Sequence, residues 1–317
     1  SVATNSPRFF GRLPLDFYLA VVLVAVISSI GSEFSAFTGD LKGDDAYFRI
    51  SRVQFIVANF PHIGWFSQSF AGHVPMGFDA PFLYFLIAAA HVVTNVSIEV
   101  LFQTTLFISM TGLGLSVYLF ARTLSLSPLV SFILALLLFT MPETWNAFVI
   151  GGAYLRIPAM PLVFLSLALA FRHIRQSNAG AESLASFLTV VSIYTLLAIV
   201  HPLLWQWTFS FIILAYTIGI IGWVNKLTTV FKTFLPVVGL TAWTYLPLIR
   251  ARATVFDTLN PNAPIHDTNL MHWSWLLQVP SADSWSITLG PLILPVAIVS
   301  LVILAFQARH FRAVRRA

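Results

Sequence analysis

The sequence contains no cysteine and few charged residues. Asp, Glu, Lys and Arg make up 9% of its 317 residues, against about a quarter in an average soluble domain. The absence of Cys excludes disulfides, thiolate metal sites and cysteine nucleophiles. The scarcity of charge accompanies 58% hydrophobic residues and a mean hydropathy of +0.85. Together these values exclude a soluble globular enzyme, a disordered chain and a disulfide-stabilised secreted domain, and they favour a polytopic helical membrane protein.

Basic residues exceed acidic ones, but their positions indicate membrane topology rather than nucleic acid binding. The formal net charge is +5. Lys and Arg near the ends of transmembrane helices favour the cytoplasmic side. Both termini carry arginines and are therefore predicted to be cytoplasmic, and we expect no nucleic acid partner. These arginines are Arg8, Arg12, Arg309, Arg312, Arg315 and Arg316.

Apolar segments long enough to approach a membrane span recur along the whole chain. A crossing helix needs about 20 mostly apolar residues. We predict an all-α fold, a polytopic transmembrane helix bundle in which 1–317 form a single transmembrane domain. The apolar segments are 15–32, 81–95, 98–121, 127–141, 157–171, 184–200, 203–224, 233–249 and 287–307.

One of these segments is expected not to cross, because nine spans cannot join two cytoplasmic termini. Segment 81–95 is the best candidate, since it is short, begins at a proline and contains His91. We interpret it as a re-entrant or interfacial segment, which leaves about eight spans. Two long loops, 33–80 and 250–286, then lie on the outer face, where a site would be assembled.

Smaller basic clusters divide the remaining turns between the two sides. Arg122, the pair Arg172 and Arg175, and the pair Lys226 and Lys232 mark inner loops. The turn at His201-Pro202 and residues 142–156 then lie outside. Glu99, near the outer end of its segment, either partners an arginine or sits at the interface.

The first outer loop carries two adjacent acids, Asp44 and Asp45. Neighbouring carboxylates repel, so one of them holds its proton more tightly or both bind a cation. Either outcome suits a general base or a ligand for a divalent cation such as Mg²⁺ or Mn²⁺. The alternative is a solvated loop with incidental acids. No paired His or Glu-His spacing predicts a preformed metal cage.

The same loop continues with the periodicity of an amphipathic helix. Between 50 and 60, apolar residues fall at Ile50, Val53, Ile56 and Val57. That spacing predicts a helix lying on the membrane surface. A segment rich in Gly, Pro and aromatic residues follows it and leads into Phe78-Asp79-Ala80-Pro81.

The order of these motifs resembles the GT-C superfamily of integral-membrane glycosyltransferases. Within it, the chain is most similar to the bacterial and archaeal membrane proteins labelled 6-pyruvoyl-tetrahydropterin synthase-related, and to the YfhO-like group. The resemblance covers roughly residues 15–250. The residues that carry it are the acid Asp45 after the first helix, the interfacial helix, Trp65, the Gly and Pro turn before Phe82-Leu83-Tyr84, Gly151-Gly152 before Ile157-Pro158, His201-Pro202, and Trp243 before Leu246-Pro247.

The resemblance implies a sugar transferase that uses a polyprenyl-phosphate donor on the outer face of a prokaryotic cytoplasmic (inner) membrane. Asp45, with Asp44, would be the catalytic base, and Asp45 a tentative metal ligand. A lipid phosphate at headgroup level calls for Arg, His or a metal. We therefore expect Arg156, His201 and Arg250 to bind the donor phosphate, and Asp79 to face Asp45.

Each of these residues also has a plainer interpretation. Arg250 can snorkel to lipid headgroups, His201 can cap a helix, and Asp79 can cap the helix that begins at Pro81. Arg49 and Asp79 depart from the motifs of the family, and the chain is short for it. These departures favour an alternative, a non-catalytic subunit that binds protein partners in a larger membrane complex. A transporter is less favoured, because no repeated half is found.

Overall fold

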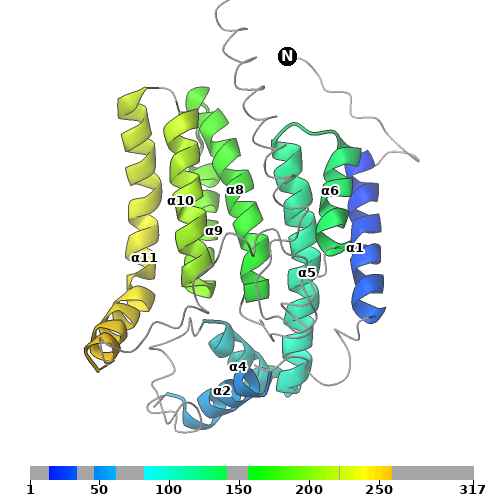
Figure 1. Ribbon diagram of the computed structural model, residues 1–317, viewed down its shortest axis with the longest axis vertical. Helices are drawn as coiled ribbons and strands as arrows, with labels where there is room; N and C mark the ends of the chain where they lie inside the picture. The colour runs from blue at the N-terminus through cyan, green and yellow to red at the C-terminus, as the bar shows by residue number, and fades with distance from the viewer. Residues whose placement is uncertain (1–13, 34–45, 62–81, 141–155, 221, 259–317) are drawn as a thin grey trace, which may run out of the picture. The chain divides into compact units, whose positions relative to one another are not determined.

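The chain is all-helical wherever its structure is described. The computed structural model describes residues 14–33, 46–61, 82–140, 156–220 and 222–258, and these contain helices without a β-sheet, as predicted (Figure 1). The helices are α1 Leu15–Glu33, α2 Ala46–Asn59, α4 Phe82–Thr94, α5 Ile98–Thr123, α6 Pro128–Thr140, α8 Arg156–Asn178, α9 Leu184–Val200, α10 Pro202–Gly219 and α11 Trp223–Thr258.

The described residues all belong to one of two compact units. Residues Ser1–Thr258 form the first unit and Leu259–Ala317 the second. The predicted span 287–307, and the part of the predicted outer loop 250–286 that follows Thr258, lie outside the described residues. A single transmembrane domain over 1–317 therefore stays a prediction.

Among the described residues, three helices are long and apolar enough to cross a membrane, which indicates a membrane location. They are Leu15–Ser32 of α1, Ile98–Thr123 of α5 and Arg156–Asn178 of α8. Further helices are apolar but shorter: Phe82–Thr94, Pro128–Phe139, Leu184–Val200, Leu204–Gly219 and Leu227–Ala242. Helix α4 has 13 residues, so it is about 20 Å long and falls short of the roughly 30 Å hydrocarbon layer.

The boundary between α10 and α11 differs from the sequence prediction. We expected segments 203–224 and 233–249 with Lys226 and Lys232 in a loop between them, but α10 ends at Gly219 and α11 runs from Trp223 to Thr258. Gly222, at φ +83°, makes the turn, because glycine adopts this left-handed conformation without strain. The lysines lie on α11, since an isolated Lys does not interrupt a helix. Residues 250–258, which were predicted to belong to the outer loop, are therefore part of α11.

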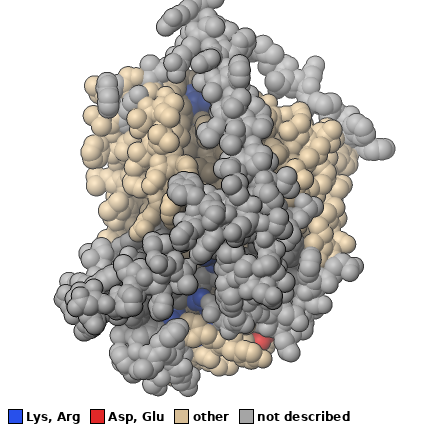
Figure 2. Space-filling view, viewed as in Figure 1, with Lys and Arg blue, Asp and Glu red and all other residues tan. Residues whose placement is uncertain are grey.

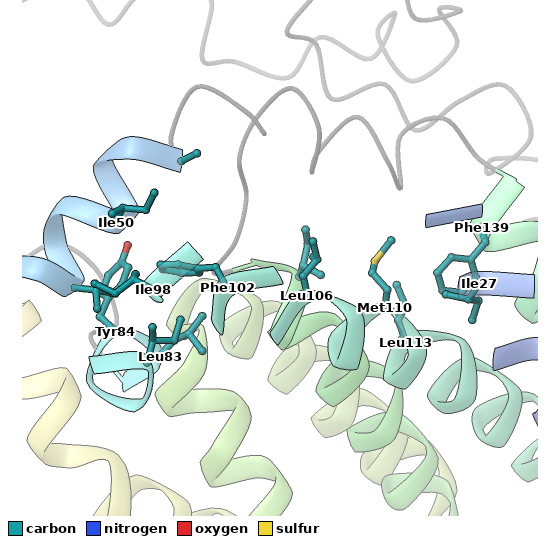
Figure 3. Close-up of a cluster of buried hydrophobic side chains, with 14 of the residues drawn as sticks. Ile27, Ile50, Leu83, Tyr84, Ile98, Phe102, Leu106, Met110, Leu113 and Phe139 are labelled. Atoms are coloured by element: carbon teal, nitrogen blue, oxygen red, sulfur yellow. The ribbon is translucent and has the colours of Figure 1, made fainter. Parts of the chain in front are cut away.

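Helix α5 lies at the centre of the first half of the bundle. It packs against α1, α4, α6 and α8. Its side chains at 102, 106, 110 and 113 follow one face and form a continuous row of buried residues, which Figure 3 shows running from Leu83 and Tyr84 of α4 to Ile27 of α1 and Phe139 of α6. This spacing of three and four residues is what a helix needs to present one apolar face.

A second core joins α8, α9, α10 and α11. Its large members are Tyr194, Trp205, Tyr216 and Phe234. Phe234 packs edge-on against Phe209 with centroids 4.6 Å apart, and it stacks on Tyr194 at 5.8 Å. Phe234 of α11 thus packs against Tyr194 of α9 and against Trp205, Phe209 and Tyr216 of α10.

The turns predicted to be inner loops contact one another at one end of the upright helices. Arg175 of α8 donates a hydrogen bond to the Thr123 carbonyl at the end of α5. Asn178 Nδ2 donates to the Gly219 carbonyl at the end of α10 at 2.8 Å. Helices α2 and α4 pack together at the other end (Figure 1). The amphipathic helix predicted for 50–60 is confirmed as a helix, and it extends over Ala46–Asn59.

Candidate functional site

Only some of the predicted site residues fall within the described structure. Asp44, Asp45 and Asp79 lie outside the described residues. The metal role predicted for Asp45 therefore stays a prediction. Arg250 lies on α11, but its side chain is not described. Among the described residues, no group of three or more His, Asp or Glu side chains is placed to hold a metal ion. A divalent cation therefore stays a prediction.

Arg156 and His201 are each placed at the start of a helix. Arg156 is the first residue of α8, and its side chain is exposed. His201 is the N-cap of α10, and its Nδ1 accepts a hydrogen bond from the Leu204 backbone N–H at 3.2 Å. A side chain that satisfies a free N–H at a helix start is a cap. The structure therefore gives His201 the capping role that was weighed against phosphate binding.

A pair of arginines that the sequence analysis did not select lies on α2. Arg49 Nη1 donates a hydrogen bond to the Tyr84 hydroxyl of α4 at 2.5 Å. The Arg52 guanidinium lies over the Phe48 ring, 4.2 Å from its centroid, and 5.5 Å from the centroid of Tyr84. The Arg49 guanidinium also lies 5.5 Å from the Phe48 centroid. We call these four residues, Phe48, Arg49, Arg52 and Tyr84, the arginine cluster.

The sequence of α2 explains how this cluster forms. Arg49 and Arg52 are three residues apart, so they lie on one side of the helix. Val53 and Ile56 next to them are buried and anchor α2. Helix α4 supplies Tyr84, which is 1% exposed. Packing of α2 on α4 thus brings two cations against aromatic faces, where the negative ring quadrupole attracts them.

The arginine cluster is unusual because it includes a charged side chain that is almost fully buried. Arg52 is 2% exposed, and withdrawing a guanidinium from water is costly unless an anion or hydrogen-bond acceptors replace the water. Each guanidinium presents five N–H donors in a planar fork. Phosphate oxygens match the fork in two-pronged geometry. The cluster is therefore chemically suited to a phosphate or a carboxylate.

Charge is sparse over the rest of the described surface. On the face shown in Figure 2, few basic and acidic atoms appear among the described atoms, most of which belong to other residues. Many large apolar side chains are exposed, among them Tyr47 and Phe60 on α2 and Val93 on α4. An apolar exterior of this kind faces lipid or other apolar surfaces. The arginine cluster is thus a local concentration of positive charge at one end of an apolar bundle.

A second polar group lies inside the bundle, toward the opposite end. His173 Nδ1 and the Tyr216 hydroxyl are 3.0 Å apart, and His173 Nε2 lies 3.1 Å from Glu182 Oε1. The Tyr194 hydroxyl continues the chain, 3.2 Å from that of Tyr216. Only Glu182 reaches the surface, with 39% of its side chain exposed. These four residues, the polar chain, join α8, α9 and α10.

Comparison with protein-family models, with curated proteins and with solved structures finds no match to this chain. The resemblance to the GT-C superfamily therefore stays a hypothesis based on the order of short motifs.

Proposed function

We propose that the protein binds the phosphate of a lipid at the α2–α4 end of the bundle, and that it acts there as a glycosyltransferase with a polyprenyl-phosphate sugar donor. The observation that carries the proposal is the arginine cluster. Arg49 and Arg52 offer two guanidinium groups, held against Phe48 and Tyr84, at one end of an apolar helix bundle. A lipid phosphate combines the charge that these groups attract with an apolar tail that fits the bundle exterior.

The proposed topology places this end on the outer face. This topology has about eight spans, both termini in the cytoplasm, and α4 as a segment that does not cross. It places the basic residues of the other end on the cytoplasmic side. Support comes from the contacts of Arg175 with Thr123 and of Asn178 with Gly219, which group the predicted inner turns. We further propose a prokaryotic cytoplasmic membrane as the location.

In the proposed reaction, the arginines hold the donor phosphate while an acceptor hydroxyl attacks the sugar. The acceptor oxygen forms the new bond to the anomeric carbon, and its proton passes to Asp45 acting as general base. The bond between that carbon and the phosphate oxygen breaks, and its electron pair leaves with the phosphate. Arg49 and Arg52 stabilise the negative charge that develops there. The role of Asp45 is supported by the resemblance alone.

The proposal is tested by separating binding from transfer. Full-length protein in lipid nanodiscs is incubated with a panel of polyprenyl-phosphate sugars, and native mass spectrometry counts the bound lipid while product is measured in parallel. We expect Arg52→Gln to weaken lipid-phosphate binding about tenfold, the loss of one charge-assisted contact. Asp45→Asn should bind the donor and fail to transfer its sugar.

Arg172→Gln is the matched control, because Arg172 is an exposed arginine on α8 near the opposite end. It should bind and transfer as the wild type does. Unchanged lipid binding in Arg52→Gln would contradict the phosphate site. Binding without transfer in the wild type, for every sugar and acceptor offered, would contradict the enzyme.

The alternative, a non-catalytic subunit, is favoured by one observation. Tyr47 and Val93 are 77% and 81% exposed on α2 and α4, an apolar surface that partner helices can cover. A protein of this kind would be isolated from its native membrane in a fixed stoichiometric complex, without bound polyprenyl phosphate.

A further inference from the structure

A recess lies beside the α2–α4 pair. Its charged side chain is acidic, whereas those of the arginine cluster are basic. The recess has a volume of about 280 Å³ and is formed by the second half of α2, the end of α4 and the start of α5. Its lining residues include one carboxylate and neither Lys nor Arg. They are Gln54, Val57, Ala58, His91, Ser97, Ile98 and Glu99.

The polar atoms of this recess are mainly hydrogen-bond acceptors. His91 Nδ1 lies 2.7 Å from the Val96 carbonyl. Because a carbonyl only accepts, Nδ1 carries the hydrogen, and in the tautomer with a single N–H the other nitrogen, Nε2, is an acceptor. The Glu99 carboxylate is an acceptor on both oxygens. Ser97 caps α5, its hydroxyl oxygen accepting from the Val100 N–H at 3.3 Å. A ligand with N–H donors and a positive charge therefore complements the Glu99 carboxylate, whereas a negative charge next to it is unfavourable.

The number and type of these groups restrict the chemical class of ligand further. One carboxylate and one imidazole are too few for a metal ion, which usually takes at least three protein ligands. A primary ammonium has three N–H donors and a positive charge, so it complements the Glu99 carboxylate and can also donate to an imidazole nitrogen. Charge-assisted hydrogen bonds of this kind are among the stronger ones in proteins.

The surroundings of the recess indicate where such an ammonium comes from. Val92 and Val93, which directly follow His91, are 62% and 81% exposed, and Phe60 near the end of α2 is 68% exposed. Apolar side chains at a bundle end, beside a polar recess, are placed as at a lipid headgroup region. We propose that this recess binds the primary ammonium group of a membrane lipid, with phosphatidylethanolamine as the headgroup that presents it. The inference does not depend on the proposed transfer reaction.

The test compares lipids that differ at the ammonium alone. Full-length protein is purified in detergent with equimolar phosphatidylethanolamine and phosphatidylcholine of matched acyl chains, and native mass spectrometry measures the lipid retained. The choline headgroup has the same charge but no N–H donor. We expect the wild type to retain phosphatidylethanolamine about tenfold more than phosphatidylcholine, and Glu99→Gln to lose this preference. His91→Ala is a second variant and should reduce it.

Glu182→Gln is the control, because it removes one carboxylate from the α8–α9 turn, outside the recess. It should keep the wild-type preference. Free ethanolamine added to the wild-type complex distinguishes two sources of the group. Displacement of the lipid shows that the ammonium alone is recognised, and retention shows that the rest of the lipid contributes; both outcomes support an ammonium site.

Two results would overturn the inference. One is equal retention of the two lipids by the wild type. The other is an unchanged preference in Glu99→Gln, which would leave Glu99 only its favourable position in the first turn of α5. If Glu99 acted only at the helix end, Glu99→Gln would lower the thermal stability equally in both lipids. It would not alter the preference for phosphatidylethanolamine.

Discussion

At the scale of single residues, Gly114 has the least room for a side chain among the described glycines. A Cβ placed at Gly114 would lie 2.5 Å from Ile27 Cδ1 and 3.1 Å from Phe139 Cε2. Ile27 and Phe139 are buried, at 0% and 1% exposure, so neither has open space to enter. Gly114 thus lets α1 and α6 approach α5 closely, as small residues do between membrane helices.

We predict opposite effects of the same substitution at two glycines. Gly114→Ala should lower the free energy of unfolding by about 1–3 kcal/mol, because it overpacks the core. Gly239→Ala should raise it by about 0.5–1 kcal/mol, since alanine favours a helix. Gly239 is an exposed residue of α11 with nothing within 4 Å of an added Cβ. Unfolding in mixed detergent micelles measures both, and a Gly114→Ala variant as stable as Gly239→Ala would contradict the packing.

The arginine cluster marks the limit of prediction at this scale. From the sequence, Arg49 stood out only as a departure from a family motif, and no motif indicated a role for Arg52. The signal available was the three-residue spacing of two arginines on a helix whose remaining face is apolar. Their burial against Tyr84 depends on how α2 packs on α4, and a periodicity along one helix does not contain that information.

At the scale of helices, the polar chain fixes how α8, α9 and α10 are aligned. A neutral His173 satisfies every link, with Tyr216 donating to Nδ1, Nε2–H donating to Glu182, and Tyr194 donating to Tyr216. Because hydrogen bonds are directional, a shift of one helix along another would break this chain, whereas apolar contacts would tolerate it. The side chains of His173, Tyr194 and Tyr216 are buried, which raises the cost of leaving any of them without its partner.

We predict that Tyr194 and Tyr216 are energetically coupled. Tyr216→Phe should lower the free energy of unfolding by about 1–3 kcal/mol, because it removes the partner of two buried polar groups. Tyr194→Phe added to Tyr216→Phe should then cost less than Tyr194→Phe alone, with a coupling of about 0.5–3 kcal/mol. A double-mutant cycle in detergent measures this coupling. Tyr47→Phe, at a 77% exposed position, is the neutral control, and strictly additive effects would argue against the chain.

Most helices could be predicted from the sequence, but not all of their ends. Apolar segments of helical length placed α1, α4, α5, α6 and α9 within about two residues of their ends, because membrane helices follow hydropathy. Helix α8 was predicted over 157–171 but continues to Asn178. The break between α10 and α11 was misplaced because Gly219–Gly222 is as apolar as a helix interior. The turn there depends on the conformation of Gly222. The polar chain was missed because Tyr216 lies 43 residues from His173 in the sequence, and no pattern along one helix relates the two.

At the scale of the whole molecule, the described part has an apolar exterior and two ends that carry different polar groups. One end holds the contacts between the turns at Thr123, Asn178 and Gly219, together with an ion pair between Asp16 and Arg122 at 2.9 Å. The other holds α2, α4, the arginine cluster and the recess lined by His91 and Glu99. This polarity matches a protein that crosses a membrane and presents chemically different surfaces on its two sides.

The most direct test of this account is the accessibility of the two ends from the two sides of a membrane. The absence of cysteine makes single-cysteine labelling straightforward. Asn59→Cys at the end of α2 and Ala181→Cys in the α8–α9 turn are both at exposed positions, and each is treated with a membrane-impermeant maleimide on intact prokaryotic cells. The account predicts labelling at position 59 in intact cells, and at position 181 only after permeabilisation. Labelling of both positions in intact cells, or of position 181 alone, would contradict it.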